Sequence, residues 1–202
     1  MADIHSTVVW ASDAWRLEAV AWIDLSLEAA GITRCGDVEQ LRIRPWATVM
    51  IVPTCDGRLW FKAAAPETAF EVMLYSMLTE LAPDAVLTPL AMDTDRSWLL
   101  MPDGGSHLDE VTRGDALVEA LTVILPRYAE LQRTMAQAAG TLIANGVADI
   151  RPAVMLSRFD EALRVTGDFD SRSGKPEHRA MWEQIADMRD TIAASCDHLA
   201  GA

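Results

Sequence analysis

The chain has 202 residues, half of them hydrophobic, which is enough to bury the core of one domain or of two small lobes. Its formal net charge of −13 argues against a surface for nucleic acid or for an anionic membrane, although a locally basic site could still bind a small anion. Cys35, Cys55 and Cys196 show no C-x-x-C spacing, which predicts a reducing compartment and neither a disulfide framework nor a zinc site.

The start of the chain and its apolar runs bear on where the protein resides. The first residues lack the basic stretch and apolar run of a signal peptide. No apolar run reaches the length that crosses a bilayer. We therefore expect a cytoplasmic protein that does not enter the membrane.

The first predicted element is an amphipathic helix that ends at Gly31. Ser12 can cap its start, with Asp13 in the first turn. Apolar residues then recur at helical spacing, namely Trp15, Ala19, Trp22, Ile23, Leu27 and Ala30. We expect the two tryptophans of this face to pack in a core and not to stack on a ligand.

From Gly36 the pattern is typical of strands. Residues 39–44 alternate between two faces, which predicts a strand with Leu41 and Ile43 on its apolar side. After an interruption at Pro45-Trp46, the apolar run 47–52 predicts a buried strand, and a turn through Asp56-Gly57 leads to a third strand over 58–64. Three strands joined by such short links predict an antiparallel sheet.

A helix and two further strands are expected next. Pro66 suits the first turn of a helix, and Pro83 follows its end. The apolar stripe of this helix consists of Phe70, Leu74, Met77, Leu78 and Leu81. We expect a fourth strand over 86–92 and a fifth over 97–101. Residues 102–105, Pro-Asp-Gly-Gly, then break the pattern and mark a lobe boundary.

The rest of the chain is expected to be helical, which makes the fold class α+β. Residues 116–139 are apolar-periodic, with Pro126 as a kink or a break. Another helix is expected to end at Asn145-Gly146, a short one to lie within 152–165, and residues 166–175 to form a polar loop. The last helix is expected over 177–199, with Met181, Trp182, Ile185, Met188 and Ile192 facing inward.

Lys62 is one of two lysines in the chain, against fifteen arginines, and it lies in the apolar third strand. Lysine carries a compact charge on a flexible stem, whereas arginine is a rigid planar fork. A lysine in this position therefore suggests a point charge placed for a phosphate. Glu71, beside the apolar stripe of the following helix, could hold the ammonium in place. The alternative is that both side chains simply lie in solvent.

The order of elements is a helix, three antiparallel strands, a helix, two strands, a break and helices, as in the N-lobe of a kinase followed by the start of a C-lobe. The stretches that match most closely are Arg44-Pro45-Trp46-Ala47-Thr48-Val49, Asp56-Gly57-Arg58-Leu59-Trp60-Phe61-Lys62, Phe70-Glu71, Trp98-Leu99-Leu100-Met101-Pro102-Asp103-Gly104-Gly105, Ala129-Glu130-Leu131-Gln132 and Gly146-Val147-Ala148-Asp149. On these residues, spread over nearly the whole chain, the sequence resembles the aminoglycoside phosphotransferase family and related choline-kinase-like small-molecule kinases.

The resemblance implies a protein-kinase-like fold. Residues 1–101 would form the N-lobe, with an N-terminal helix, a five-stranded antiparallel sheet and the helix that carries Glu71. Residues 102–105 would be the hinge, and 106–202 an incomplete, all-helical C-lobe. Lys62 would contact the α- and β-phosphates of ATP, and Glu71 would pair with Lys62.

The resemblance assigns further residues to the nucleotide. Leu100, Met101 and Asp103 would form the hinge strip, whose backbone meets the adenine. Trp46, in the link 44–46, would lie over the phosphates, although this link lacks the G-x-G-x-x-G of protein kinases. Packing at the sheet edge is the alternative for Trp46, and packing in the core is the alternative for Leu100 and Met101.

Phosphoryl transfer needs three further groups: a catalytic Asp, an Asn five residues later that binds Mg²⁺, and a second Asp for Mg²⁺. The single Asn of the chain, Asn145, has Gly140 five residues before it. His107-Leu108-Asp109 comes too soon after the hinge, and Asp168-Phe169-Asp170 has no catalytic loop before it. We therefore expect that this chain contains neither the catalytic Asp nor the ligands for Mg²⁺.

The family's catalytic loop would begin shortly after a helix like the last one here. Two explanations for the missing catalytic loop stay open. The chain is either a piece of a kinase-like enzyme or a naturally short protein that retains the kinase lobe but has lost catalysis. In a partial C-lobe the inward faces around Trp182, Ile185 and Ile192 would lack partners, which predicts aggregation or a homodimer through these helices.

The function that the resemblance implies is ATP-dependent phosphoryl transfer to a hydroxyl of a small molecule, with these 202 residues alone not catalysing it. The alternatives are a non-catalytic nucleotide-binding or protein-interaction module derived from a kinase lobe, and an α+β protein without a nucleotide site. ATP and Mg²⁺ are the expected cofactors of the family, and a nucleotide and an unidentified small-molecule acceptor are the expected partners.

Overall fold

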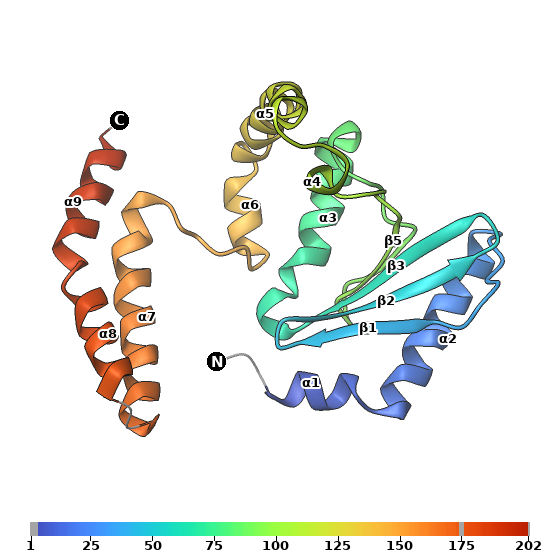
Figure 1. Ribbon diagram of the computed structural model, residues 1–202, viewed down its shortest axis with the longest axis horizontal. Helices are drawn as coiled ribbons and strands as arrows, with labels where there is room; N and C mark the ends of the chain where they lie inside the picture. The colour runs from blue at the N-terminus through green and yellow to red at the C-terminus, as the bar shows by residue number, and fades with distance from the viewer. Residues whose placement is uncertain (1–3, 174–175, 202) are drawn as a thin grey trace. The chain divides into compact units, whose positions relative to one another are not determined.

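The computed structural model describes residues 4–173 and 176–201 and has the expected α+β class (Figure 1). The strands are β1 Glu39–Arg44, β2 Ala47–Thr54, β3 Gly57–Ala64, β4 Ala91–Asp93 and β5 Trp98–Pro102. The helices are α1 Ile4–Trp10, α2 Asp13–Ala29, α3 Phe70–Leu81, α4 Leu108–Val111, α5 Asp115–Ala136, α6 Ala139–Ala144, α7 Pro152–Ser173, α8 Pro176–Ala186 and α9 Arg189–Ala200, with short 3₁₀ turns η1 Pro66–Thr68 and η2 Pro83–Ala85.

The chain divides into two compact units, Met1–Val147 and Ala148–Ala202. The first unit contains the sheet together with α1 to α6, and the second contains α7 to α9. Residues 106–147 thus belong to the same unit as the sheet, and the expected hinge at 102–105 stays a prediction.

The five strands form one antiparallel sheet in the order β1-β2-β3-β5-β4, which confirms the expected five-stranded antiparallel sheet. The predicted tight turn between β2 and β3 is present, with Gly57 at φ +136°, a conformation that favours glycine. β3 is the central strand, because β2 pairs along one of its edges and β5 along the other. A residue in the middle of β3 is therefore fixed from both sides.

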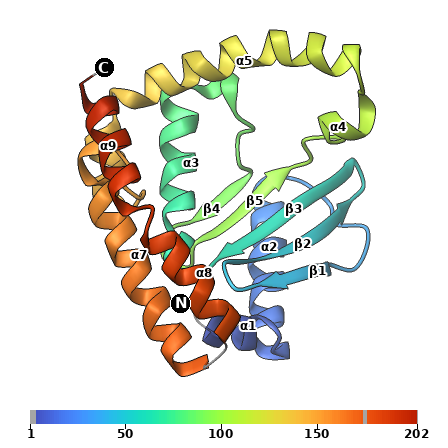
Figure 2. The ribbon, with the colours of Figure 1, turned by 60° about the vertical axis from the view of Figure 1, so that its left-hand side comes forward.

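The core lies between α2 and one face of the sheet (Figures 1 and 2). The Ser12 hydroxyl accepts a hydrogen bond from the Trp15 backbone N–H at 3.3 Å, which confirms the predicted helix cap. Both tryptophans of α2 pack as expected. Trp15 and Trp22 meet Trp98 edge-on, with ring centroids 6.1 and 5.6 Å away, and Trp22 also meets Phe61 at 5.7 Å.

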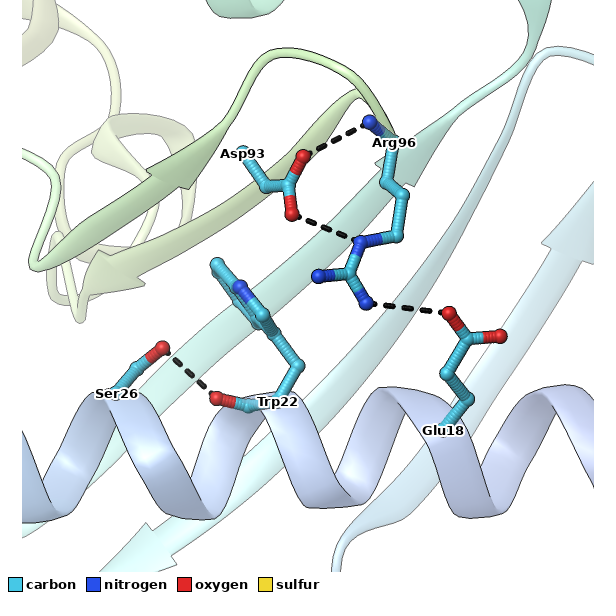
Figure 3. A network of polar contacts seen from close by, with 5 residues as sticks. All are labelled: Glu18, Trp22, Ser26, Asp93 and Arg96. Atoms are coloured by element: carbon cyan, nitrogen blue, oxygen red, sulfur yellow. Dashed lines mark hydrogen bonds and ion pairs between the residues drawn. The ribbon is translucent and has the colours of Figure 1, made fainter.

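Polar contacts tie the β4–β5 turn to α2 (Figure 3). Arg96 donates from its backbone N–H and its Nε to the Asp93 carboxylate at 2.9 and 2.8 Å, and from a terminal nitrogen to Glu18 at 3.1 Å. Its guanidinium also stacks 4.6 Å from the centre of the Trp98 ring. The turn thus covers the tryptophan cluster at this end of the core.

β1 departs from the expected alternation. The register shifts between Gln40 and Arg42, which is a bulge, and Leu41 is 46% exposed instead of lying on an apolar face. Gln40 turns inward and donates from Nε2 to the Trp10 carbonyl and to the Thr48 hydroxyl. The polar contacts of Gln40 therefore determine which face of β1 points to the core, and the prediction that Leu41 lies on that face was wrong.

The fourth strand is shorter than predicted, because only Ala91–Asp93 pairs with β5. Residues 86–90 contain Pro89, which cannot donate to a ladder, and they follow the 3₁₀ turn that begins at Pro83. The fifth strand was predicted correctly to within one residue at each end.

The helical segments after the sheet agree only in part with expectation. α5 runs through Pro126 as one helix, so Pro126 does not break it, and the expected kink stays a prediction. α7 continues to Ser173, so most of the predicted polar loop 166–175 is helical, while residues 174–175 lie outside the described range. The predicted helix 177–199 is divided at Asp187 and Met188 into α8 and α9.

The inward face predicted for the last helix is only partly confirmed. Trp182 packs on α7 and donates from Nε1 to the Leu163 carbonyl at 2.9 Å. Met181, Ile185 and Met188 are exposed, whereas Ile192 is half-buried. The expected homodimer stays a prediction.

The core predicts a strong effect of truncating Ile23, which is fully buried on α2. Ile23→Ala should lower the free energy of unfolding by about 3 kcal/mol, because it removes packed methylenes and leaves a cavity. Leu17→Ala is the matched control on the same helix, since Leu17 is 72% exposed and its loss should change stability by less than about 0.5 kcal/mol. Urea unfolding followed by tryptophan fluorescence measures both, and equal effects would contradict this core.

Candidate functional site

Lys62 and Glu71 form an ion pair in the first unit. The Lys62 Nζ donates to Glu71 Oε2, and the two side chains are 33% and 25% exposed. An ion pair with this much solvent access contributes only about 0–1 kcal/mol to stability. Stability alone therefore gives little reason for a lysine in the middle of the central strand, and its ammonium stays accessible to a ligand.

The sequence between the two residues sets the position of Glu71. Ala65 is buried at the end of β3, and Pro66 begins the 3₁₀ turn η1 that leads into α3. Val72 is 1% exposed and anchors the first turn of α3. Its neighbour Glu71 lies in that first turn, where the helix dipole also favours a carboxylate.

Lys62 shares its face of the sheet with residues of every neighbouring strand. It pairs with Val49 of β2 and Leu99 of β5, and Val49 pairs in turn with Arg42 of β1. Directly paired residues point to the same face, so Arg42 stands on this face two strand spacings, about 10 Å, from Lys62. In a protein of net charge −13, this row brings two cations to one surface.

The next row on this face is apolar across β2, β3 and β5. Ile51, Trp60 and Met101 are paired and half-buried, and Glu39 of β1 pairs with Ile51 at the end of the row. The face therefore offers an apolar strip beside the cationic row. Such a strip could receive a planar ring, while the cations could receive an anionic group attached to that ring.

Asp103 is held by contacts to β3. Its carboxylate accepts from Arg58 Nε at 2.7 Å, from Trp60 Nε1 at 3.0 Å and from the Gly105 backbone N–H at 3.2 Å. The hydrogen bond from Trp60, followed by that from Arg58, lowers the pKa of Asp103 below its ordinary value. Arg58 also stacks 5.3 Å from the centre of the Trp60 ring. These contacts fix the indole of Trp60 at the edge of the apolar strip.

Trp46 lies in the link between β1 and β2, and its side chain is 55% exposed. Its carbonyl accepts from the Ala65 backbone N–H at 2.9 Å and from the Thr68 hydroxyl at 2.6 Å. The link is thereby tied to the segment that joins Lys62 to Glu71. The indole therefore lies outside the core, and its expected contact with a ligand stays a prediction.

The two expected hinge residues in β5 occupy opposite faces. Leu100 is fully buried under α2, which is the packing alternative that the sequence left open, and its carbonyl accepts from the Leu90 backbone N–H at 2.7 Å. Met101 pairs with Trp60 and shares the face of Lys62. Of these two side chains, Met101 is the one placed to contact a ligand beside Lys62.

Arg42, Arg58, Trp60 and Thr68 were not singled out from the sequence as site residues. Arg42 and Trp60 reach the site through strand register, and Arg58 and Thr68 through contacts between segments far apart in the chain. In the sequence, the alternation of Arg58, Trp60 and Lys62 along one strand indicates that these three side chains share a face, and this was the one available signal for Arg58 and Trp60.

The two sequence triplets with catalytic residue types lie on other elements than the residues of this site. His107 is exposed and precedes the short helix α4, and the side chain of Asp109 lies outside the described residues. Asp168 lies in α7, within the second unit. Across residues 4–173 and 176–201, no cluster of three or more His, Cys, Asp or Glu side chains could hold a metal ion.

A hollow of about 650 Å³ lies elsewhere in the first unit, lined by residues from 81–85 and from 124–134. Figure 2 shows α5 crossing near the end of α3 at this place. Glu71 and Leu81 are ten residues, or about 15 Å, apart along α3. The hollow is therefore separate from the Lys62 pair, and its lining carries none of the residues expected to bind a nucleotide.

The arrangement fits part of what ATP and Mg²⁺ would need. Lys62 and Arg42 provide cations for phosphate oxygens, and Trp60 and Met101 provide an apolar surface for a base. The nearest carboxylate to Lys62, that of Glu71, is already paired with the lysine. Among the described residues, the site thus has groups of the kinds that a nucleotide would use, and no set of three carboxylate, His or Cys ligands for Mg²⁺.

Comparison with models of known protein families and with curated proteins gave no match, so the resemblance to small-molecule kinases depends on the residues and their arrangement. None of the helices in the part of the chain that the structure describes combines the length and apolarity needed to cross a membrane.

The contacts of Asp103 predict a pH dependence of stability. Because its pKa in the folded protein is lowered, the carboxylate stabilises the fold above the ordinary value of 3.8, and this contribution is lost as the pH falls through the folded pKa. Asp103→Asn should therefore lower the urea midpoint at pH 7, and the gap between the two proteins should narrow below about pH 4. A gap of constant size from pH 7 to pH 3 would contradict a role for the charge of Asp103.

Proposed function

We propose that the first unit binds the phosphates of a nucleotide at Lys62, in the manner of a kinase N-lobe. The observation that carries this proposal is the ion pair between Lys62 on the central strand and Glu71 in the first turn of the following helix. In kinases a lysine of the third strand contacts the α- and β-phosphates while a glutamate of the next helix holds it.

The surroundings of the pair support the same function. Arg42 adds a second cation to the row of Lys62, and Trp60 and Met101 add an apolar strip next to it. The phosphates would contact Lys62 and Arg42, the base would lie against the strip, and Trp46 would cover the phosphate end from the β1–β2 link. ATP would supply the transferable phosphoryl group.

Binding and chemistry are separate questions for this chain. The resemblance points to phosphoryl transfer to a hydroxyl of a small molecule. The sequence, however, has no Asp five residues before its single Asn, which the catalytic loop of that reaction requires. The absence of this pair favours a second candidate for these residues, a nucleotide-binding module that does not catalyse transfer by itself.

We expect Lys62→Met to weaken the binding of Mg-ATP at least tenfold in isothermal titration calorimetry. Losing a charge-assisted contact to a phosphate costs about 1.5–3 kcal/mol, and each 1.4 kcal/mol is a factor of ten in Kd. Methionine keeps the length and the apolar stem of lysine, so the strand should be preserved. Arg42→Gln should weaken binding less, because Arg42 stands at the end of the cationic row.

Lys175→Met is the control, since it removes the other lysine of the chain and changes the net charge equally. Glu71→Gln should also weaken Mg-ATP, by leaving the ammonium without its carboxylate. Absence of Mg-ATP binding to the wild-type protein, or equal binding by Lys62→Met and Lys175→Met, would contradict the proposal.

We also expect the purified 202 residues to show no phosphoryl transfer from ATP to water or to added hydroxyl acceptors. Release of ADP at a range of Mg²⁺ concentrations, measured by a coupled assay, tests this. Steady turnover that Lys62→Ala abolishes would show that catalytic groups are present after all.

A further inference from the structure

Two of the three cysteines are brought to one place by a short antiparallel ladder outside the main strand pairings. Arg34 and Thr54 form an isolated bridge. On either side of it, the Cys35 backbone N–H donates to the Pro53 carbonyl and the Cys55 backbone N–H donates to the Thr33 carbonyl, both at 3.1 Å. Cys35 and Cys55 therefore flank the bridged pair, and their side chains point to the same face.

The environment of the two thiols differs from that of the third. Cys35 and Cys55 are exposed, while Cys196 is buried in α9 of the second unit. The pKa of the Cys55 thiol is raised, first by its hydrogen bond with the Cys35 side chain. The ladder itself places the two cysteines as diagonal neighbours across the bridge.

We propose that Cys35 and Cys55 form an oxidation site, at which the two thiols join in a reversible intramolecular disulfide. Diagonal neighbours in an antiparallel ladder have Cα atoms about 7–8 Å apart, slightly more than a disulfide accepts. The shift needed is small, and it falls on residues beside a single bridge and a turn. The flanking backbone can therefore adjust without changing the main sheet.

Hydrogen peroxide is the oxidant class that balances the reaction. The Cys35 thiolate attacks one peroxide oxygen, the O–O bond breaks, and the leaving hydroxide takes a proton to become water. The Cys55 thiol then attacks the Cys35 sulfenic acid, forms the S–S bond and releases a second water. Two thiols are oxidised by two electrons in total and one peroxide is reduced. The steps balance equally with the two cysteines exchanged.

The disulfide would fasten the segment before β1 to the turn between β2 and β3. Lys62 lies five residues beyond Gly57, which is about 16 Å along β3. Oxidation should therefore leave binding at Lys62 unchanged while raising the midpoint of thermal unfolding, since the crosslink closes a loop of the unfolded chain. The inference is thus independent of the proposed nucleotide site.

The test treats the 202-residue chain with hydrogen peroxide, blocks the remaining thiols under non-reducing conditions and maps the peptides by mass spectrometry. We expect one crosslink, between the peptides of Cys35 and Cys55, that dithiothreitol removes. Cys196→Ser should keep this product, and Cys35→Ser and Cys55→Ser should each abolish it. A crosslink that includes Cys196, disulfides between chains, or only sulfinic and sulfonic acids would overturn the proposal.

A second measurement uses the unmutated protein and so does not depend on the folding of the serine variants. Phenylarsine oxide bridges two neighbouring thiols and should bind at one equivalent per chain, with both Cys35 and Cys55 becoming unreactive to a maleimide. Labelling of both residues at the rate of the untreated protein would show that the thiols are too far apart.

Discussion

The alternation of side chains along β3 is the constraint on which the arrangement of this protein depends. Phe61 and Ala63 are buried under α2, so Trp60 and Lys62 must point to the opposite face. The contact between α2 and the sheet thus positions a lysine that makes no part of that core. A slip of one residue in the pairing of β3 would bury the ammonium among tryptophans, at a cost far above the worth of the Lys62–Glu71 pair.

The other parts of the site are brought to Lys62 by one buried anchor and by weaker contacts at the surface. Val72 anchors the helix that carries Glu71, Thr68 ties the Trp46 link to the start of that helix, and Asp103 holds the indole of Trp60. The hydrogen bonds of Thr68 and Asp103 lie at the surface, where such contacts are weak, and they orient groups that the core has already placed. The result is an accessible cation between an apolar strip and an exposed link, an arrangement that suits a phosphate attached to a flat ring.

Predictions from the sequence were correct where the structure of a segment depends on its own residues. They were wrong where it depends on contacts with another segment. The cap at Ser12, the apolar run of β2 and the turn before Gly57 are local features, and the structure confirms them. The face of Leu41 was mispredicted because Gln40 finds polar partners on α1 and β2. The polar stretch after Val165 is helical because its residues continue α7, although their composition is typical of a loop.

The sequence by itself determined that a lysine lies in an apolar strand and a glutamate follows in the next helix, because both facts depend on residue type and local periodicity. Only the tertiary structure decided which groups share their surroundings. The pairing of Arg42 with Val49, the contacts of Arg58 and Trp60 with Asp103, and the approach of Cys35 to Cys55 all depend on strand register between segments far apart in the chain. Register follows from the burial of whole faces and from the geometry of turns, so no single stretch of sequence specifies it.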